Sequence, residues 1–229
     1  MRPEQHEGYL DPAKEAGVDE MSEDGVPRQT SFEQYLNVLM MACAGIEDLY
    51  FHVPLVTEIK DRDEFVKAVG YRERVYCYEL YHQQRLLLTK QKLHKRGLLL
   101  NAETDKSGTV YTKWIGARKP DFILHRPGEG THNIAILEAK AIVAPIDDIE
   151  EDLKKLKDFL NPRTMNYFGA VALIYGEHGD AKIDEITALV KRHFGKYWPA
   201  RFRALWHRKP RTRPEMWNYK TGTFAPLAV

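Results

Sequence analysis

The sequence predicts an α/β fold, and three observations carry this prediction. Residues 119–125 and 133–142 are apolar, β-branched runs on either side of Gly128-Glu129-Gly130, which is typical of two adjacent antiparallel strands. Residues 146–160 keep helical spacing until Asn161-Pro162, and the apolar run 167–175 that follows is typical of a strand buried on both faces. A strand hairpin, a helix and a further buried strand in this order indicate an α/β domain.

Helices are also expected before the hairpin and after the last buried run. Ser31 and Gln34 resemble a capping box at the start of a helix over about 32–50. Residues 62–69 are amphipathic, and a long second helix is expected over about 72–95, where proline and glycine are absent. The remaining expected elements are strands at 98–100 and 109–115 around a turn at 105–108, and a closing helix over 183–194.

The charges divide the chain into three parts. The total net charge is only +1, but residues 1–30 are rich in acids, glycine and proline, which predicts an acidic flexible arm. Residues 31–195 are expected to form one core domain. Residues 196–229 form a basic extension rich in tryptophan and arginine, with neither a clear helical nor a clear extended pattern.

The composition is that of an ordinary folded protein without a membrane segment. The hydrophobic fraction is 43% and the charged fraction 29%, and the two cysteines, Cys43 and Cys77, imply no disulfide framework. The N-terminus has no apolar signal core, and the best apolar run, 36–46, is too short to span a bilayer. We therefore expect a cytoplasmic protein with no membrane partner.

Three charged residues stand out on the expected hairpin. A turn centred between Glu129 and Gly130 places Asp121 opposite Glu138, and side-chain alternation puts Lys140 on the same face as Glu138. The flanking residues are apolar, so these charges would lie on buried strands, which is costly without a ligand or metal. The competing interpretation is a surface hairpin with an ion pair.

The three residues suit phosphodiester hydrolysis. The carboxylates of Asp121 and Glu138, with the backbone carbonyl of Ala139, are oxygen ligands of the kind that Mg²⁺ prefers, and Mn²⁺ is a second candidate. A metal in such a site activates water and polarises a phosphoryl oxygen. Lys140 could orient or deprotonate the attacking water, or neutralise charge on the phosphate.

Pro120-Asp121, followed after a hairpin-sized gap by Glu138-Ala139-Lys140, resembles the signature of the PD-(D/E)XK nucleases. The resemblance covers about half of the chain, residues 72–175. It implies a restriction-endonuclease-like α-β-β-β-α-β core, with a mixed central sheet flanked by helices, in addition to the N-terminal helix and the basic C-terminal extension. It also implies a metal-dependent nuclease with Asp121, Glu138 and Lys140 as catalytic residues. The resemblance favours DNA over RNA as the substrate and restriction or genome defence as the role. It is also compatible with a homodimer or with a partner protein.

Many members of this family carry a further glutamate on the helix before the strands, and the resemblance makes Glu79 the candidate, with Glu73 as runner-up. His82 and Gln83 share a helical face with Glu79 and could contact nucleic acid. The competing interpretations are an exposed Glu79 paired with a neighbouring arginine and a structural His82. The charged residues 150–152 and 154–155 are expected to form a solvated helix face without a role in the site.

The basic extension offers a second candidate surface for nucleic acid. Arg208 and Arg211 could neutralise phosphates, while bases stack on Trp206 or Trp217. In the competing interpretation the tryptophans pack the extension onto the core. Two other functions also remain open, a catalytically silent nucleic-acid-binding subunit of the same fold and a protein-interaction module.

Overall fold

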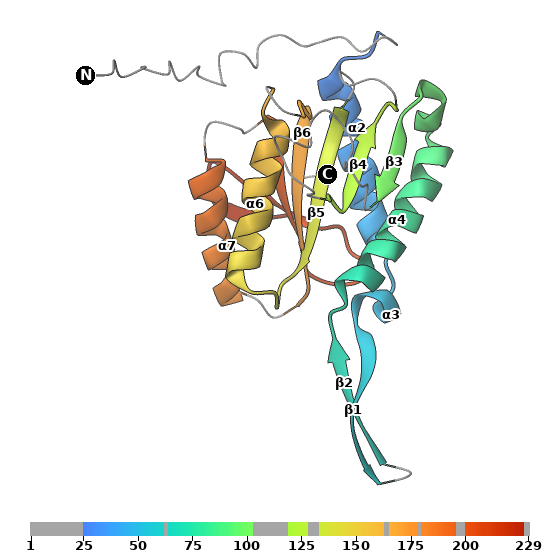
Figure 1. Ribbon diagram of the computed structural model, residues 1–229, viewed down its shortest axis with the longest axis vertical. Helices are drawn as coiled ribbons and strands as arrows, with labels where there is room; N and C mark the ends of the chain where they lie inside the picture. Colours follow the sequence, from blue (N-terminus) through green and yellow to red (C-terminus); the bar gives the residue numbers. More distant parts are fainter. Residues whose placement is uncertain are drawn as a thin grey trace, which may run out of the picture.

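The computed structural model confirms an α/β fold, built on a mixed sheet with seven described strands (Figure 1). The structure describes residues 25–61, 64–102, 119–127, 133–162, 165–177, 180–195 and 200–226, with the backbone alone over 55–69 and at 180. The strands follow chain order across the sheet: β3 (Leu99–Ala102), β4 (Phe122–His125), β5 (Asn133–Ala141), β6 (Gly169–Tyr175), β7 (Phe202–His207), β8 (Glu215–Asn218) and β9 (Thr223–Ala225). The central strands β5, β6 and β7 are parallel, and the outer neighbours pair antiparallel.

Helices cover both faces of the sheet. On one face, α2 (Arg28–Ala44) and α4 (Glu73–Lys90) share a hydrophobic core with the sheet; on the other, α6 (Ile146–Leu160) and α7 (Asp180–His193) form a second core (Figure 1). Two shorter elements, α3 (Asp48–Phe51) and η1 (Leu93–Arg96), follow α2 and α4. Among the described residues, no helix is long and apolar enough to cross a membrane.

Strand β5 lies between these two cores and is buried on both faces. Leu137 belongs to the core with α2 and α4, whereas Ile136 belongs to the core with α6 and α7. Because strand side chains alternate, Glu138 and Lys140 point to the α6 side, and Ala139 points to the α2 side. The continuous apolar run in the sequence is therefore explained by burial on both faces.

The first helix begins earlier and ends earlier than its sequence pattern indicated. It runs from Arg28 after Pro27, and Gly45 follows its last residue, Ala44. Ser31 is not the start of a capping box, since it lies inside the helix and its hydroxyl contacts the Pro27 carbonyl. The expected second helix is confirmed as α4, which is followed by the single turn η1.

A two-stranded hairpin projects from the body of the molecule between α3 and α4 (Figure 1). Its strands are β1 (Val53–Asp61) and β2 (Glu64–Gly70), paired antiparallel. The amphipathic pattern of residues 62–69 thus belongs mostly to a strand, and the sequence did not indicate β1.

The C-terminal extension contributes three strands to the sheet. β7 pairs with β6 in parallel, from Ala170↔Phe202 to Tyr175↔His207, and β8 and β9 continue outward. The absence of a clear extended pattern in this extension was therefore misleading. The expected strand 109–115, the turn 105–108, most of the acidic arm and Trp198 lie outside the described residues.

Candidate active site

The candidate site lies where β5 continues beyond the first residue of β4. The hairpin register matches the sequence prediction: Phe122 faces Leu137 and Ile123 faces Ile136, so Asp121, just before β4, comes opposite Glu138. The backbone N–H of Ala139 donates a hydrogen bond to Asp121 Oδ2 at 2.8 Å. The N–H and C=O of one strand residue point to the same neighbour, so the Ala139 carbonyl is directed to the Asp121 side as well.

Lysines and carboxylates from three elements meet at this position. Lys140 Nζ lies 3.1 Å from Glu73 Oε2 on α4 and 3.3 Å from Asp152 Oδ2 on α6. Lys155 Nζ, also on α6, lies 2.9 Å from Glu138 Oε2 and 3.1 Å from Asp152 Oδ1. Together with Asp121 these side chains form the charge cluster: Glu73, Asp121, Glu138, Lys140, Asp152 and Lys155.

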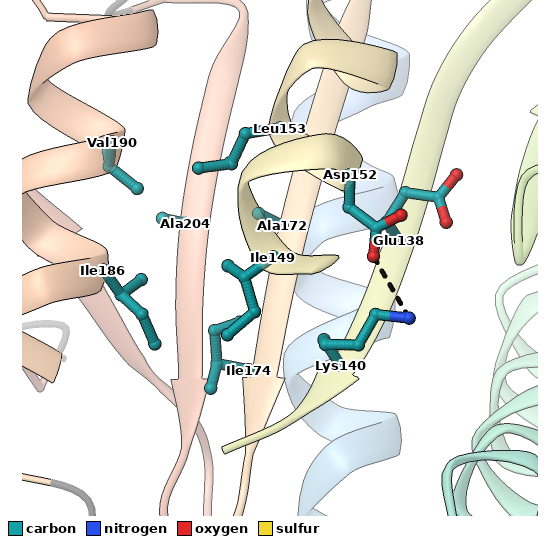
Figure 2. Close-up of a pocket in the computed structure, with 10 residues that line it drawn as sticks. All are labelled: Glu138, Lys140, Ile149, Asp152, Leu153, Ala172, Ile174, Ile186, Val190 and Ala204. Carbon is teal, nitrogen blue, oxygen red and sulfur yellow. Dashed lines mark ion pairs between the residues drawn. The ribbon is translucent and has the colours of Figure 1, made fainter. Parts of the chain in front are cut away.

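Figure 2 shows a small pocket that α6, α7 and the sheet line mostly with apolar side chains. The charged side chains of Glu138, Asp152 and Lys140 line the same pocket on one side (Figure 2). Their side chains are 4%, 15% and 21% exposed, respectively, so solvent reaches the cluster only partly. Charges are therefore held close together at a place where water screens them weakly.

Burial makes the two motif carboxylates reluctant to ionise. The pKa of Asp121 is raised to about 6, mainly by burial, although the hydrogen bond from the Ala139 N–H opposes the rise. Burial and the nearby Asp121 raise the pKa of Glu138 well above its usual value. Within the described structure, Glu138 Oε1 is buried without a hydrogen-bond partner. An unpartnered carboxylate oxygen of this kind favours an added cation.

The donor set fits a hard divalent cation. Asp121 and Glu138 offer carboxylate oxygens on one face, and Ala139 offers a carbonyl directed to the same place. Mg²⁺ binds through one or two carboxylates and keeps several waters, so this small set is sufficient. No group of three or more His, Cys, Asp or Glu side chains arranged for a metal occurs in the described parts of the chain.

The structure places Glu73, not Glu79, in the charge cluster. Glu79 is only 9% exposed and accepts a 2.6 Å hydrogen bond from Gln83 Nε2, while His82 Nδ1 lies 3.4 Å from its other oxygen. Glu73 and Glu79 are six residues apart and so lie about 120° apart around α4. Glu79 contacts His82 and Gln83 as expected, but neither of these contacts joins the three residues to Lys140.

The expectation that residues 150–152 and 154–155 form only a solvated helix face was wrong for two of them. Asp152 and Lys155 are each 15% exposed and belong to the charge cluster. A signal for this was present, since Asp152 shares a helix face with Leu156 and Phe159, four and seven residues later. A carboxylate inside the apolar stripe of a helix marks a buried ion pair.

The tail residues predicted to bind nucleic acid have mainly structural contacts. Trp206 and Trp217 are 3% and 8% exposed, and Trp206 Nε1 donates to the Gly176 carbonyl at 3.0 Å. Base stacking on these rings is therefore excluded in this fold, and the packing interpretation is correct. The Arg208 guanidinium lies 4.3 Å from a ring centroid of Trp206, and Arg211 lies 3.7 Å from Glu47.

Comparison with known proteins adds no relative. No family model matches the chain, and neither a curated protein nor a solved structure matches it. Functional inference therefore depends on the motif and on the geometry of the charge cluster.

Proposed function

We propose that the protein is a metal-dependent nuclease of the PD-(D/E)XK type, with a restriction-endonuclease-like core, that hydrolyses phosphodiester bonds. The main support is the hairpin register, which brings Asp121 opposite Glu138 with Lys140 on the same face of β5. The order α4, β3, β4, β5, α6, β6, with β6 parallel to β5, also agrees with the core that the motif implies. DNA is the substrate favoured by the resemblance, with restriction or genome defence as the role.

Asp121, Glu138 and the Ala139 carbonyl would hold the metal. When bound, Mg²⁺ or Mn²⁺ would supply an activated water and neutralise charge on the phosphate. The two carboxylates would be kept in place by the β4–β5 ladder and by the hydrogen bond between Ala139 and Asp121.

Lys140 is better suited to neutralise charge than to accept a proton. Burial disfavours its charged form, yet Asp152 and Glu73 raise the pKa of its ammonium above the usual value. An ammonium held by two carboxylates stays protonated at neutral pH, so it can donate hydrogen bonds to a phosphate oxygen. Of the two roles indicated by the sequence, the structure favours electrostatic stabilisation.

One observation favours a catalytically silent alternative. Lys155 Nζ lies 2.9 Å from Glu138 Oε2, so an internal ammonium already neutralises the most buried carboxylate of the cluster. If Lys155 stayed there, the same fold would serve as a binding subunit. A nucleic-acid-binding subunit and an enzyme therefore differ in whether metal replaces this contact.

Cleavage assays separate the two functions. The full chain is incubated with linear, circular and single-stranded DNA and with RNA, in Mg²⁺, Mn²⁺ or EDTA. We expect metal-dependent cleavage that falls at least about 100-fold in Asp121→Asn and in Lys140→Ala, as for loss of a transition-state contact. Lys154→Ala, which removes an exposed lysine of α6, is the matched control and should retain activity. Wild-type cleavage rates in either site variant would falsify the assignment, and absence of cleavage in all forms would favour the binding subunit.

A second pair of variants identifies the auxiliary glutamate. Glu73→Gln removes a carboxylate that holds Lys140, so activity should fall about 10-fold, as for other outer contacts of metal sites. Glu79→Gln should stay close to wild type, because Gln83 and His82 are its contacts. The reverse order of the two activities would restore Glu79 as the site residue.

A further inference from the structure

The exposed side of α4 and η1 is strongly basic. Lys90, Lys92 and Lys95 are all exposed where α4 ends and η1 follows, and Arg85 is exposed one turn earlier. Between residues 72 and 98 the acids are Glu73 and Glu79 alone. Because Glu73 contacts Lys140 and Glu79 is buried, neither carboxylate neutralises this surface.

Exposed aromatic and apolar side chains occur on the same helix. Tyr78 and Arg85 follow Arg74 by four and eleven residues, which places the three side chains on one narrow stripe of the helix. Tyr78 is 59% exposed, and so is Leu86 at 55%. The Arg85 guanidinium lies 6.0 Å from the ring centroid of Tyr81. Cations beside exposed rings are the chemistry that binds phosphates and stacks bases.

This surface is continuous with the charge cluster. Glu73, in the first turn of α4, reaches Lys140, and Cys77, one turn later, has its pKa raised by burial and by Asp121. Figure 1 shows α4 along the flank of the molecule, with the β1–β2 hairpin leaving from its N-terminal end. A polyanion lying on α4 would therefore end at the candidate site.

The helix on the opposite side of the cluster has the opposite charge character. The exposed residues of α6 include four acids, Asp147, Asp148, Glu151 and Asp158, and two lysines, Lys154 and Lys157. The cluster thus lies between a basic helix surface and a largely acidic one, which would orient a polyanion toward α4.

We propose that the exposed surface of α4 and η1 binds the phosphate backbone of the nucleic acid that the candidate site acts on. This α4 surface combines the stripe of Arg74, Tyr78 and Arg85 with the exposed lysines where α4 ends and η1 follows, Lys90, Lys92 and Lys95. That the partner is nucleic acid rests on the proposed function. The α4 surface takes the place of the buried tryptophans of the C-terminal extension as the expected main contact.

Binding in EDTA tests this surface without requiring catalysis. Anisotropy of labelled duplex and single-stranded DNA and of RNA is measured from 50 to 200 mM salt, for the wild type and for the triple variant Lys90→Gln, Lys92→Gln, Lys95→Gln. We expect at least about 10-fold weaker binding and a salt slope reduced by about 2 to 3, since each phosphate contact contributes about 0.9. Tyr78→Ala should weaken single-strand binding about 5-fold or more through lost stacking.

Two triple variants with the same loss of charge serve as controls. Lys154→Gln, Lys157→Gln, Arg192→Gln removes exposed cations of α6 and α7, and Arg208→Gln, Lys209→Gln, Arg211→Gln removes three cations of the extension, of which Arg208 is only partly exposed. Circular dichroism confirms that each variant is folded. Unchanged binding in both controls supports the α4 surface. A larger loss in either control, or no binding by the wild type at 50 mM salt, overturns it.

The same variants separate failure of this inference from failure of the proposed function. Weaker binding by the α4 triple variant without cleavage by the wild type would support the surface and contradict the nuclease. Metal-dependent cleavage by the wild type, together with unchanged nucleic-acid affinity of the α4 triple variant, would support the nuclease and contradict the α4 surface.

Discussion

At the scale of single residues, Asp121 carries a conflict between stability and function. Burial disfavours the charged form of its carboxyl group and raises the pKa from 3.8 to about 6. The folded state therefore holds a proton that the unfolded chain has already released between these two values. The free energy of unfolding therefore falls as the pH rises from 3.8 to about 6. Above this window the total loss is about 2–3 kcal/mol, allowing for the partial exposure of the side chain.

Asp121→Asn should consequently stabilise the metal-free protein. Asparagine is neutral at every pH and can still accept the hydrogen bond from the Ala139 N–H. In EDTA at pH 8 we expect the free energy of unfolding to rise by about 2 kcal/mol relative to the wild type, and at pH 4 this difference should shrink to about 0.5 kcal/mol. Urea denaturation at both pH values measures this, with Asp184→Asn on the exposed side of α7 as control. A variant less stable than the wild type at pH 8 would show that Lys155 and Lys140 overcompensate the burial.

Residue-level sequence patterns predicted the centre of the candidate site but not its surroundings. Asp121, Glu138 and Lys140 were predictable because a symmetric turn and period-two alternation determine which side chains share a face. The choice between Glu73 and Glu79 depends on the rotation of α4 against the sheet, which tertiary packing sets. Asp152 and Lys155 come from a later helix: the position of Asp152 in the apolar stripe of α6 indicates burial, but its pairing with Lys140 is long-range and has no local pattern.

At the scale of elements, the close contact between α2 and β6 fixes how one helix layer lies on the sheet. Gly169 begins β6, and a Cβ built there would lie 2.3 Å from Phe32 Cε2 of α2. Phe32 is fully buried, so its ring has little room to move. The glycine is required by helix-to-sheet distance and not by a left-handed backbone.

Gly169→Ala should therefore destabilise the fold. We expect a loss of about 1–3 kcal/mol, the usual cost of overpacking, and a melting temperature lower by several degrees. The double variant Gly169→Ala, Phe32→Leu should recover part of this loss, because the shorter side chain frees the space. Calorimetry on the single and double variants measures the coupling, and an unchanged melting temperature in Gly169→Ala would mean that α2 shifts at little cost.

Element prediction succeeded where the local pattern was strong and failed where pairing was distant. The segments of α4, β4, β5, α6, β6 and α7 were all expected, since their helical spacing or apolar runs are continuous. β7 was not, although Ala204-Leu205-Trp206 is apolar, because arginines and prolines surround this short run. Its strand character is supplied by the parallel ladder with β6, which a local window does not contain.

At the scale of the whole molecule, the C-terminal extension belongs to the sheet that carries the candidate site. β5, which holds Glu138 and Lys140, pairs with β6, and β6 pairs with β7. Tyr76 of α4 donates or accepts a 2.9 Å hydrogen bond with His207 at the end of β7, so the extension also contacts the helix that supplies Glu73. Burial lowers the pKa of His207 to about 4, which leaves this imidazole neutral near pH 7.

Trp206 should accordingly support stability and not nucleic-acid affinity. Its ring is buried, its N–H is bonded to the Gly176 carbonyl, and Phe224 of β9 packs at 6.1 Å between ring centroids. Trp206→Ala should lower the free energy of unfolding by about 3–5 kcal/mol, and Trp206→Phe by less, because most of the buried ring is kept. Below the melting temperature of each variant, affinity for DNA in EDTA should stay within about twofold of the wild type. Weaker binding by a Trp206→Phe variant of wild-type stability would instead place nucleic acid on the extension. The expected result, unchanged affinity, leaves the α4 surface as the site where nucleic acid binds.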